Sequence, residues 1–200
     1  MDDRLFKWVN HLADRTPWLH GIATTYATYG VGLFAALLLL AWWDARHTDD
    51  PAVAVAAVTW AGAAALVGVL AVQLIGAPIN RARPTAVIHG THLLLERTTD
   101  FSFPSDHGTA TAAVAFGLLV AGSRLRHRWY GPVAIVLALL MGIDRMYVGA
   151  HYPSDVIAGF VLGALIATVL ARPATRILTR ATRAFASTPA RVLIAATPDQ

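Results

Sequence analysis

The chain has 200 residues, of which 56% are hydrophobic and only 14% are charged, and it contains no cysteine. A charged fraction this far below the usual about 25% is typical of a membrane protein. The absence of cysteine excludes disulfides, thiolate metal sites and cysteine nucleophiles. The formal net charge is +4, but the arginines lie at the ends of apolar blocks. We therefore expect these arginines to face anionic lipid and expect no nucleic-acid partner.

The chain begins with an amphipathic segment over residues 4–18. Leu5, Trp8, Val9 and Leu12 recur in it at helical spacing, with charged residues between them. This segment is too polar to cross a membrane, so it predicts a helix that lies at the bilayer interface.

Five apolar blocks follow the amphipathic segment, and each predicts a membrane-spanning helix. They cover about 21–43, 52–75, 106–122, 130–147 and 155–171. A span needs roughly 17–25 residues, so the last three blocks are short, as expected of helices packed inside a bundle. The predicted fold is an all-α integral membrane bundle of about five spans, in which residues 1–171 form one domain.

The segment 172–200 is predicted to be a basic cytoplasmic tail. Arg176, Arg180 and Arg183 recur at spacings of four and three residues. They predict either a basic helical face along the inner leaflet or a frayed, solvated terminus.

The orientation of the bundle follows from its basic residues. If the five spans alternate in direction, nine arginines lie on the same side of the membrane as the C-terminus. The opposite side holds seven basic residues, of which three belong to the polar clusters described below and are not counted, so four remain. Basic residues favour the cytoplasmic side. The polar clusters should then face outward.

One polar cluster with candidate catalytic residues is FPSDHGT, residues 103–109. Ser105 is placed as the N-cap of a helix, with Asp106 and His107 in its first turn. Free N–H groups and the positive end of the helix dipole there make an anion site. Simple helix capping is the alternative, but it leaves His107 unexplained.

A second cluster is HYPSD, where His151 and Asp155 are four residues apart and share a helix face. A carboxylate on one imidazole nitrogen fixes the tautomer and leaves the other nitrogen free to attack. Arg83 and Arg145 add planar guanidinium groups suited to phosphate oxygens. Helix capping and snorkelling at the interface are the simpler alternatives for each pair taken alone.

Together these residues indicate phosphoryl transfer. The arginines and the helix N-terminus would bind an anion, one histidine could attack phosphorus, and the other could protonate the leaving oxygen. The reaction would pass through a phosphohistidine.

The order and spacing of these clusters resemble the type 2 phosphatidic acid phosphatase superfamily of membrane lipid phosphatases. The family pattern is Lys-x6-Arg-Pro, then Pro-Ser-Gly-His, then Ser-Arg-x5-His-x3-Asp. In this chain the first part ends in Arg83-Pro84, and the second corresponds to Pro104 to His107. The third corresponds to Asp144-Arg145-x5-His151-x3-Asp155. The FPSDH form and the N-terminal segment are most similar to the bacitracin-resistance-type undecaprenyl-diphosphate phosphatases.

The chain departs from the family pattern at three positions. Gly76 stands where the family has lysine, Asp106 replaces glycine, and Asp144 replaces serine. Arg81 is the residue that could supply the missing cation.

The resemblance implies the fold, with a PAP2/haloperoxidase-like core, and a role for each matched residue. His151 would be the nucleophile, Asp155 its orienting partner and His107 the acid. Arg83 and Arg145 would bind the phosphate, helped by Ser105 and its neighbour Asp106. No metal or other cofactor is implied, and a homodimer is one of the assemblies left open.

The remaining polar stretch is 85–102, a predicted cap over the site. His89, His92, Glu96 and Arg97 could contact a second phosphate, although mutual contacts within a loop are the better explanation. A metal site at His89 and His92 is disfavoured because no clear set of further ligands accompanies them.

Three functions remain open at this point. The first is removal of the terminal phosphate from a polyprenyl diphosphate such as undecaprenyl diphosphate, which recycles the carrier lipid of cell-wall synthesis. The second is the same chemistry on phosphatidate or phosphatidylglycerophosphate. The third is a non-catalytic membrane transporter or scaffold, which the complete set of His107, His151 and Asp155 argues against.

The orientation can be tested directly. We expect a reporter that is active only in the cytoplasm to be active when fused after Gln200, because the arginine excess places that end inside. Activity of a periplasmic reporter at the same position would reverse the predicted orientation.

Overall fold

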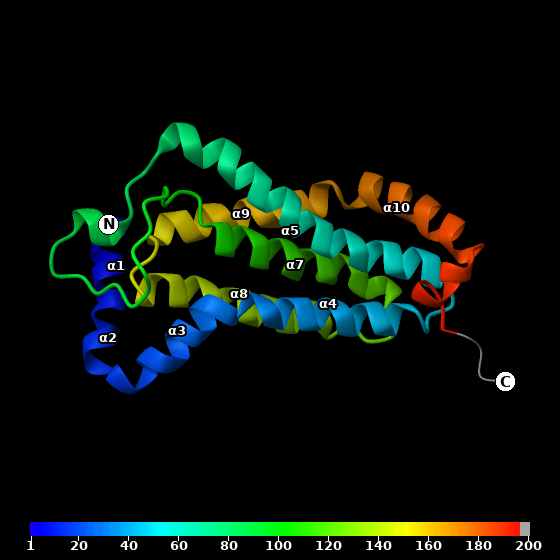
Figure 1. Ribbon diagram of the computed structural model, residues 1–200, viewed down its shortest axis with the longest axis horizontal. Helices are drawn as coiled ribbons and strands as arrows, with labels where there is room; N and C mark the ends of the chain where they lie inside the picture. Colours follow the sequence, from blue (N-terminus) through cyan, green and yellow to red (C-terminus); the bar gives the residue numbers. More distant parts are fainter. Residues whose placement is uncertain (197–200) are drawn as a thin grey trace.

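The computed structural model describes residues 1–196, in which helices are joined by loops and no strand occurs. The long helices run along the molecule (Figure 1): α4 (Val31–Ala45), α5 (Pro51–Ile79), α7 (Asp106–Ala121), α8 (Tyr130–Tyr147) and α9 (Pro153–Val169). The predicted all-α membrane bundle is confirmed, and each predicted apolar block forms helix.

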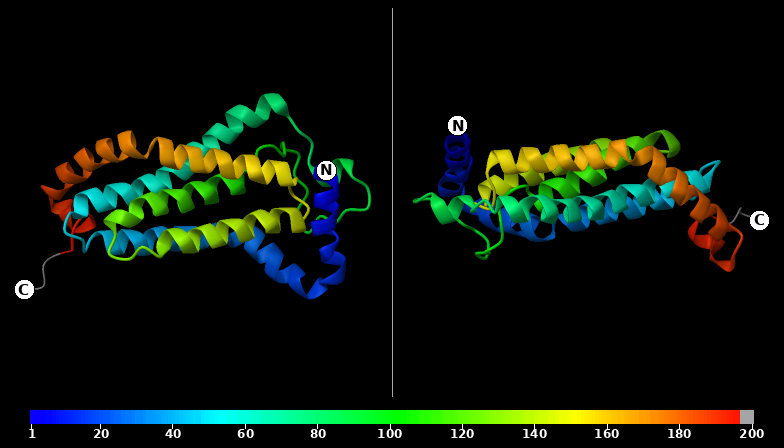
Figure 2. Two further views of the ribbon diagram at one scale, coloured as in Figure 1. Left: turned by 180° about the vertical axis from the view of Figure 1, so that it is seen from behind. Right: turned by 90° about the horizontal axis from the view of Figure 1, so that it is seen from above.

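Further helices lie toward the two ends of the bundle. At one end are α1 (Asp2–Asn10), α2 (Leu12–Arg15), η1 (Pro17–Leu19) and α6 (Pro84–Val87). At the other are η2 (Gly122–Arg124), α10 (Ala171–Ala186) and η3 (Pro189–Leu193). Figures 1 and 2 show α1 crossing one end of the bundle, while α10 lies toward the opposite end.

The first apolar block is bent, where the sequence suggested one continuous span. It forms α3 (His20–Tyr29) and α4, and the two helices meet at an angle of 54°. Gly30 lies at the break, and a side chain there would collide with the carbonyl and the ring of Tyr26. The Tyr26 hydroxyl donates a hydrogen bond of 2.7 Å to the carbonyl of Leu137 on α8. This contact ties the bent segment to the bundle.

By length and apolar composition, two segments among residues 1–196 could each cross a membrane, Pro51–Val87 and Tyr130–Tyr147. The number rises to four if each of two bent pairs is one span. These pairs are Pro17–Tyr29 with Val31–Ala45 and Pro153–Val169 with Ala171–Ala186.

Helix α7 lies at the centre of the bundle and packs against α5, α8 and α9. Glycines on the facing helices allow this close approach. A side chain at Gly163 of α9 would collide with the backbone of Thr109, and one at Gly159 would collide with the carbonyl of Ser105. The first turns of α7 and α9 are therefore adjacent, and the Ser105 amide donates to the carbonyl of Asp155 at 3.0 Å.

Candidate active site

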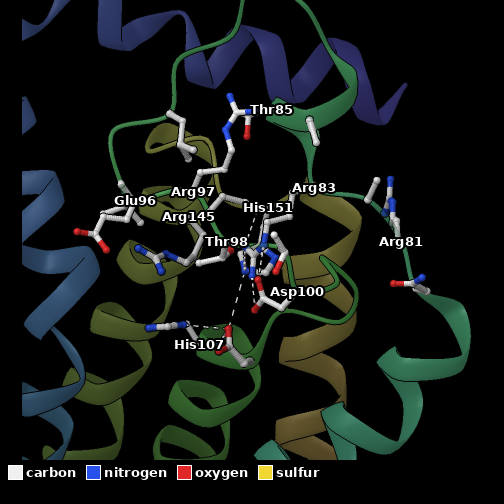
Figure 3. A pocket seen from close by; sticks show the side chains of 18 residues that line it. Arg81, Arg83, Thr85, Glu96, Arg97, Thr98, Asp100, His107, Arg145 and His151 are labelled. Atoms are coloured by element: carbon white, nitrogen blue, oxygen red, sulfur yellow. Dashed lines mark hydrogen bonds and ion pairs between the residues drawn. The ribbon is translucent and has the colours of Figure 1, made fainter.

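Three polar segments that are distant in sequence meet at the end of the bundle that α1 crosses. They enclose a cavity of about 590 Å³ (Figure 3). Six of the residues predicted for the site line it: Arg81, Arg83, Asp106, His107, Arg145 and His151. The other two, Ser105 and Asp155, lie behind the cavity wall with no exposed surface.

His151 is buried at the base of the cavity, in the connection between α8 and α9. Its Nδ1 lies 2.8 Å from the carbonyl oxygen of Ser102. A carbonyl oxygen can only accept a hydrogen bond, so Nδ1 carries the proton and Nε2 keeps its lone pair. Burial lowers the pKa of His151, and the nearby carboxylates of Asp155 and Asp106 only partly oppose this shift. The ring is therefore held neutral, with a free nitrogen beside the cavity.

Asp155 lies 3.8 Å from His151 Nδ1, which is longer than a hydrogen bond. Its Oδ2 accepts from the Ser102 hydroxyl at 2.5 Å and from the Tyr152 amide at 2.9 Å. Ser102 thus contacts both partners, through its carbonyl to His151 and through its hydroxyl to Asp155. The role of Asp155 as an orienting partner stays a prediction, and in this arrangement Ser102 links it to the ring.

Arg81 neutralises the buried charge of Asp155. Its Nη1 lies 2.6 Å from Asp155 Oδ1 and 2.7 Å from the hydroxyl of Ser154. Its Nη2 lies 2.7 Å from Asp2 Oδ2 on α1, and its guanidinium carbon stacks 3.9 Å from the centre of the Tyr152 ring. Both terminal nitrogens therefore contact carboxylates of the protein. The predicted contact between Arg81 and substrate stays a prediction.

The position of the family lysine, Gly76, is covered by an aromatic ring. A side chain at Gly76 would collide with the ring of Phe101. The ring and a lysine side chain would compete for the same space. Phe101, in the loop that precedes α7, therefore fills the volume that a lysine at position 76 would need.

Arg83 lies against the nucleophile candidate. Its Nη1 donates to the carbonyl of Ala150 at 3.0 Å and lies 3.4 Å from His151 Nε2. Its Nε and Nη2 contact the carboxylate of Asp100 at 3.2 Å and 3.0 Å. One edge of this guanidinium is therefore next to the reacting nitrogen, and the other is occupied.

Arg145 differs from Arg83 because two of its nitrogens make no hydrogen bond within residues 1–196. Its side chain is 4% exposed, and its nearest acid is Asp144, with Oδ2 3.6 Å from Nη2. Both Nε and Nη2 of Arg145 are buried without a hydrogen-bond partner in the described part of the chain. Buried unpaired N–H groups are rare and costly. A guanidinium in this state on a cavity wall indicates an anion-binding position.

The first turn of α7 supplies the second histidine. The Ser105 hydroxyl accepts from the Gly108 amide at 3.2 Å, so the predicted N-cap is present. Asp106 Oδ1 lies 2.9 Å from His107 Nδ1 and 3.8 Å from His151 Nε2. Both imidazole rings are therefore within reach of a single phosphate-sized group.

Sequence reasoning missed two residues that contact this machinery, Ser102 and Asp100. Neither belongs to a recognisable motif, and only the folded loop brings them next to His151 and Arg83. For metal binding, no group of three or more His, Asp or Glu side chains in residues 1–196 is arranged to hold an ion.

Of the four loop residues considered as contacts for a second phosphate, two line the cavity and two do not. Glu96 and Arg97 line the cavity, whereas His92 points away to Asp14 of α2, with 2.6 Å between Nε2 and Oδ1. His89 is exposed and does not line the cavity.

Comparison with known proteins gives a consistent set of relatives. Residues 56–177 match the model of the PAP2 superfamily. The chain is 31% identical over 166 residues to the undecaprenyl-diphosphatase BcrC of Bacillus subtilis, covering 83% of this chain and 80% of that protein.

Two solved structures share the fold. LpxE of Aquifex aeolicus superposes with a TM-score of 0.62 at 24% identity, covering 85% of this chain and 93% of the other. A transmembrane PAP2-type phosphatidylglycerolphosphate phosphatase from Bacillus subtilis gives a TM-score of 0.59 at 22% identity, covering 86% and 83%.

The Arg81–Asp155 pair predicts an asymmetric effect on stability. Replacing Arg81 with Gln should lower the free energy of unfolding by about 2 kcal/mol, because it leaves the buried Asp155 charge without a cation. Replacing Asp2 with Asn should cost less, because Asp2 is 29% exposed. Denaturation of the purified protein in detergent, followed by helicity, measures both changes.

The double variant Arg81→Gln/Asp155→Asn is the control, since it removes the unpaired charge and should recover part of the loss. Equal costs for Arg81→Gln and Asp2→Asn, or no recovery in the double variant, would contradict this account of the pair.

Proposed function

The chain belongs to the PAP2 superfamily, and from that premise we propose that it is a membrane lipid phosphatase that hydrolyses the terminal phosphate of a polyprenyl diphosphate. The relative named an undecaprenyl-diphosphatase supports undecaprenyl diphosphate as the substrate. The product would be undecaprenyl phosphate, the recycled carrier lipid of cell-wall synthesis.

The observation that carries this proposal is the unprotonated Nε2 of His151, which lies next to the guanidinium groups of Arg83 and Arg145. Burial and the Ser102 carbonyl keep the imidazole neutral and oriented. Arg83 lies 3.4 Å from that nitrogen. Arg145 lines the same cavity, and its Nε and Nη2 have no hydrogen-bond partner within residues 1–196. A nucleophile beside anion-binding groups is the arrangement that phosphoryl transfer requires.

The first step forms a bond between His151 Nε2 and the terminal phosphorus. The bond from that phosphorus to the bridging oxygen breaks, and His107 donates a proton to this oxygen as the lipid monophosphate leaves. Arg83 and Arg145 stabilise the charge that spreads over the phosphoryl oxygens in the transition state.

In the second step water attacks the phosphorus of the phosphohistidine. His107, now neutral, accepts a proton from the water, and the bond between nitrogen and phosphorus breaks. Inorganic phosphate leaves, while His151 returns to its neutral form and His107 to its protonated form. The cycle is balanced without any further reactant.

The membrane placement completes the proposal. The cavity lies at one end of the bundle, so the charged headgroup can reach it while the prenyl chain stays in the bilayer. We place that end at the outer face of a bacterial cell membrane, with the residues after 171 in the cytoplasm, because arginines are in excess on the opposite side.

The function is tested by phosphate release from lipids presented in detergent. The unaltered protein should hydrolyse undecaprenyl diphosphate faster than phosphatidate or phosphatidylglycerophosphate. His151→Ala should lower the rate by about 1,000-fold or more, because the covalent step is lost.

His47→Ala is the matched control, since His47 lies at the other end of the bundle, where it contacts Trp43. A faster rate on either phospholipid would move the substrate to the second class. Release of phosphate by His151→Ala at the unaltered rate would refute the mechanism, and no release from any of these lipids would favour a non-catalytic protein.

The rate should also depend on pH in a defined direction. Burial lowers the pKa of His151 below its usual 6.5, so the nucleophile is neutral above that value and is protonated only at lower pH. With chemistry rate-limiting, the acid limb of the profile should therefore lie below pH 6.5. An acid limb centred above pH 6.5 would contradict a buried, neutral His151 as the nucleophile.

A further inference from the structure

The two arginines predicted to bind phosphate are in different states. Within residues 1–196, Nε and Nη2 of Arg145 have no hydrogen-bond partner, whereas Arg83 is paired through Nε and Nη2 with both oxygens of Asp100, at 3.2 Å and 3.0 Å. Two parallel N–H···O contacts are the geometry in which a guanidinium binds a phosphate. The Asp100 carboxylate therefore occupies the edge of Arg83 that suits a phosphate group.

The position of Asp100 is set by the loop on either side of it. The next residue, Phe101, packs on Gly76 of α5, and the amide of Ser102 donates to the Arg81 carbonyl at 2.8 Å. On the other side, the Leu94 amide donates to the carbonyl of Val148 at 3.1 Å. The loop is thus anchored at both ends, and Asp100 lies directly beside the second anchor.

The carboxylate itself is accessible. The Asp100 side chain is 58% exposed, compared with 16% for Arg83. Partial burial by itself raises the pKa of Asp100, but hydrogen bonds from Thr98 and Arg83 and the charge of Arg83 bring it below its ordinary value. Asp100 is therefore an anion at neutral pH, and it can move into solvent without leaving a buried charge behind.

We propose that Asp100 is an intramolecular competitor for phosphate, which pairs with Arg83 in the free protein, is displaced by the substrate, and returns to help release the product. This role rests on the proposed phosphatase function and adds a determinant of phosphate affinity to it. An entering phosphate takes the edge of Arg83 from Asp100, and Arg145 on the same cavity wall adds a second cation. After hydrolysis, the same carboxylate competes with inorganic phosphate for Arg83.

This competition gives the site a form of selectivity. Inorganic phosphate binds only through its own charge, so it bears the full cost of displacing Asp100. A lipid substrate offsets that cost through its apolar chain in the bilayer. The carboxylate should therefore weaken the binding of free phosphate without preventing the binding of lipid.

The test compares two acidic residues of the same loop that line the same cavity. Asp100→Asn removes the carboxylate that contacts Arg83, while Glu96→Gln removes an equal charge that makes no ion pair or hydrogen bond within residues 1–196. The probe is inorganic phosphate, titrated calorimetrically into the purified full-length chain in detergent. We expect Asp100→Asn to bind phosphate about three- to tenfold more tightly, Glu96→Gln to change affinity less than twofold, and Asp100→Glu to stay near the unaltered value.

Turnover of undecaprenyl diphosphate supplies a second readout. Asp100→Asn should be inhibited by lower concentrations of inorganic phosphate and should show a lower KM, with kcat unchanged or reduced by slower product release. Equal phosphate affinity in the Asp100→Asn variant and the unaltered protein would overturn the competitor role and leave the phosphatase function intact. A lower kcat with no change in phosphate affinity would overturn it as well. If no variant binds phosphate and none is inhibited by it, the proposed phosphatase site is itself refuted.

Discussion

A buried negative charge, the carboxylate of Asp155, organises the active-site end of the molecule. It is fully enclosed, and such a charge persists only where cations and hydrogen-bond donors surround it. Those donors come from separate parts of the chain: Arg81 after α5, Ser102 before α7, and the Tyr152 amide at the start of α9. Satisfying one carboxylate therefore fixes the relative positions of three segments, and His151 is held among them.

The helix bundle prepares this arrangement by close contact between α7 and α9. Glycines on α9 bring its first turn next to the first turn of α7, so the nucleophile candidate and His107 face one cavity. The N-terminal helix contributes from the side, because Asp2 shares Arg81 with Asp155. Asp2, which precedes the predicted amphipathic segment 4–18, thus connects α1 to the site through its ion pair with Arg81 and two hydrogen bonds from Ser154.

The sequence predicted the helices well because they follow from strong local signals, and its site residues, which stay a prediction, lie around or directly behind one cavity. Apolar blocks end where polar residues begin, and Ser105 caps α7 as its motif predicts. The bend at Gly30 was missed, because a lone glycine in an apolar run is compatible with a straight helix. Ser102 and Asp100 were missed for a different reason: their partners lie 53 and 17 residues away, and no pattern in a single chain encodes such contacts.

The contact between Phe101 and Gly76 has a consequence for how sequences of this kind can diverge. The ring and a lysine side chain are alternative occupants of one volume, so adding the long side chain requires the ring to leave. Either change by itself would create a collision or a void. Position 76 on α5 and position 101 in the loop should consequently vary together across homologous chains. A chain with lysine at position 76 should have a smaller residue at position 101 or a different loop conformation.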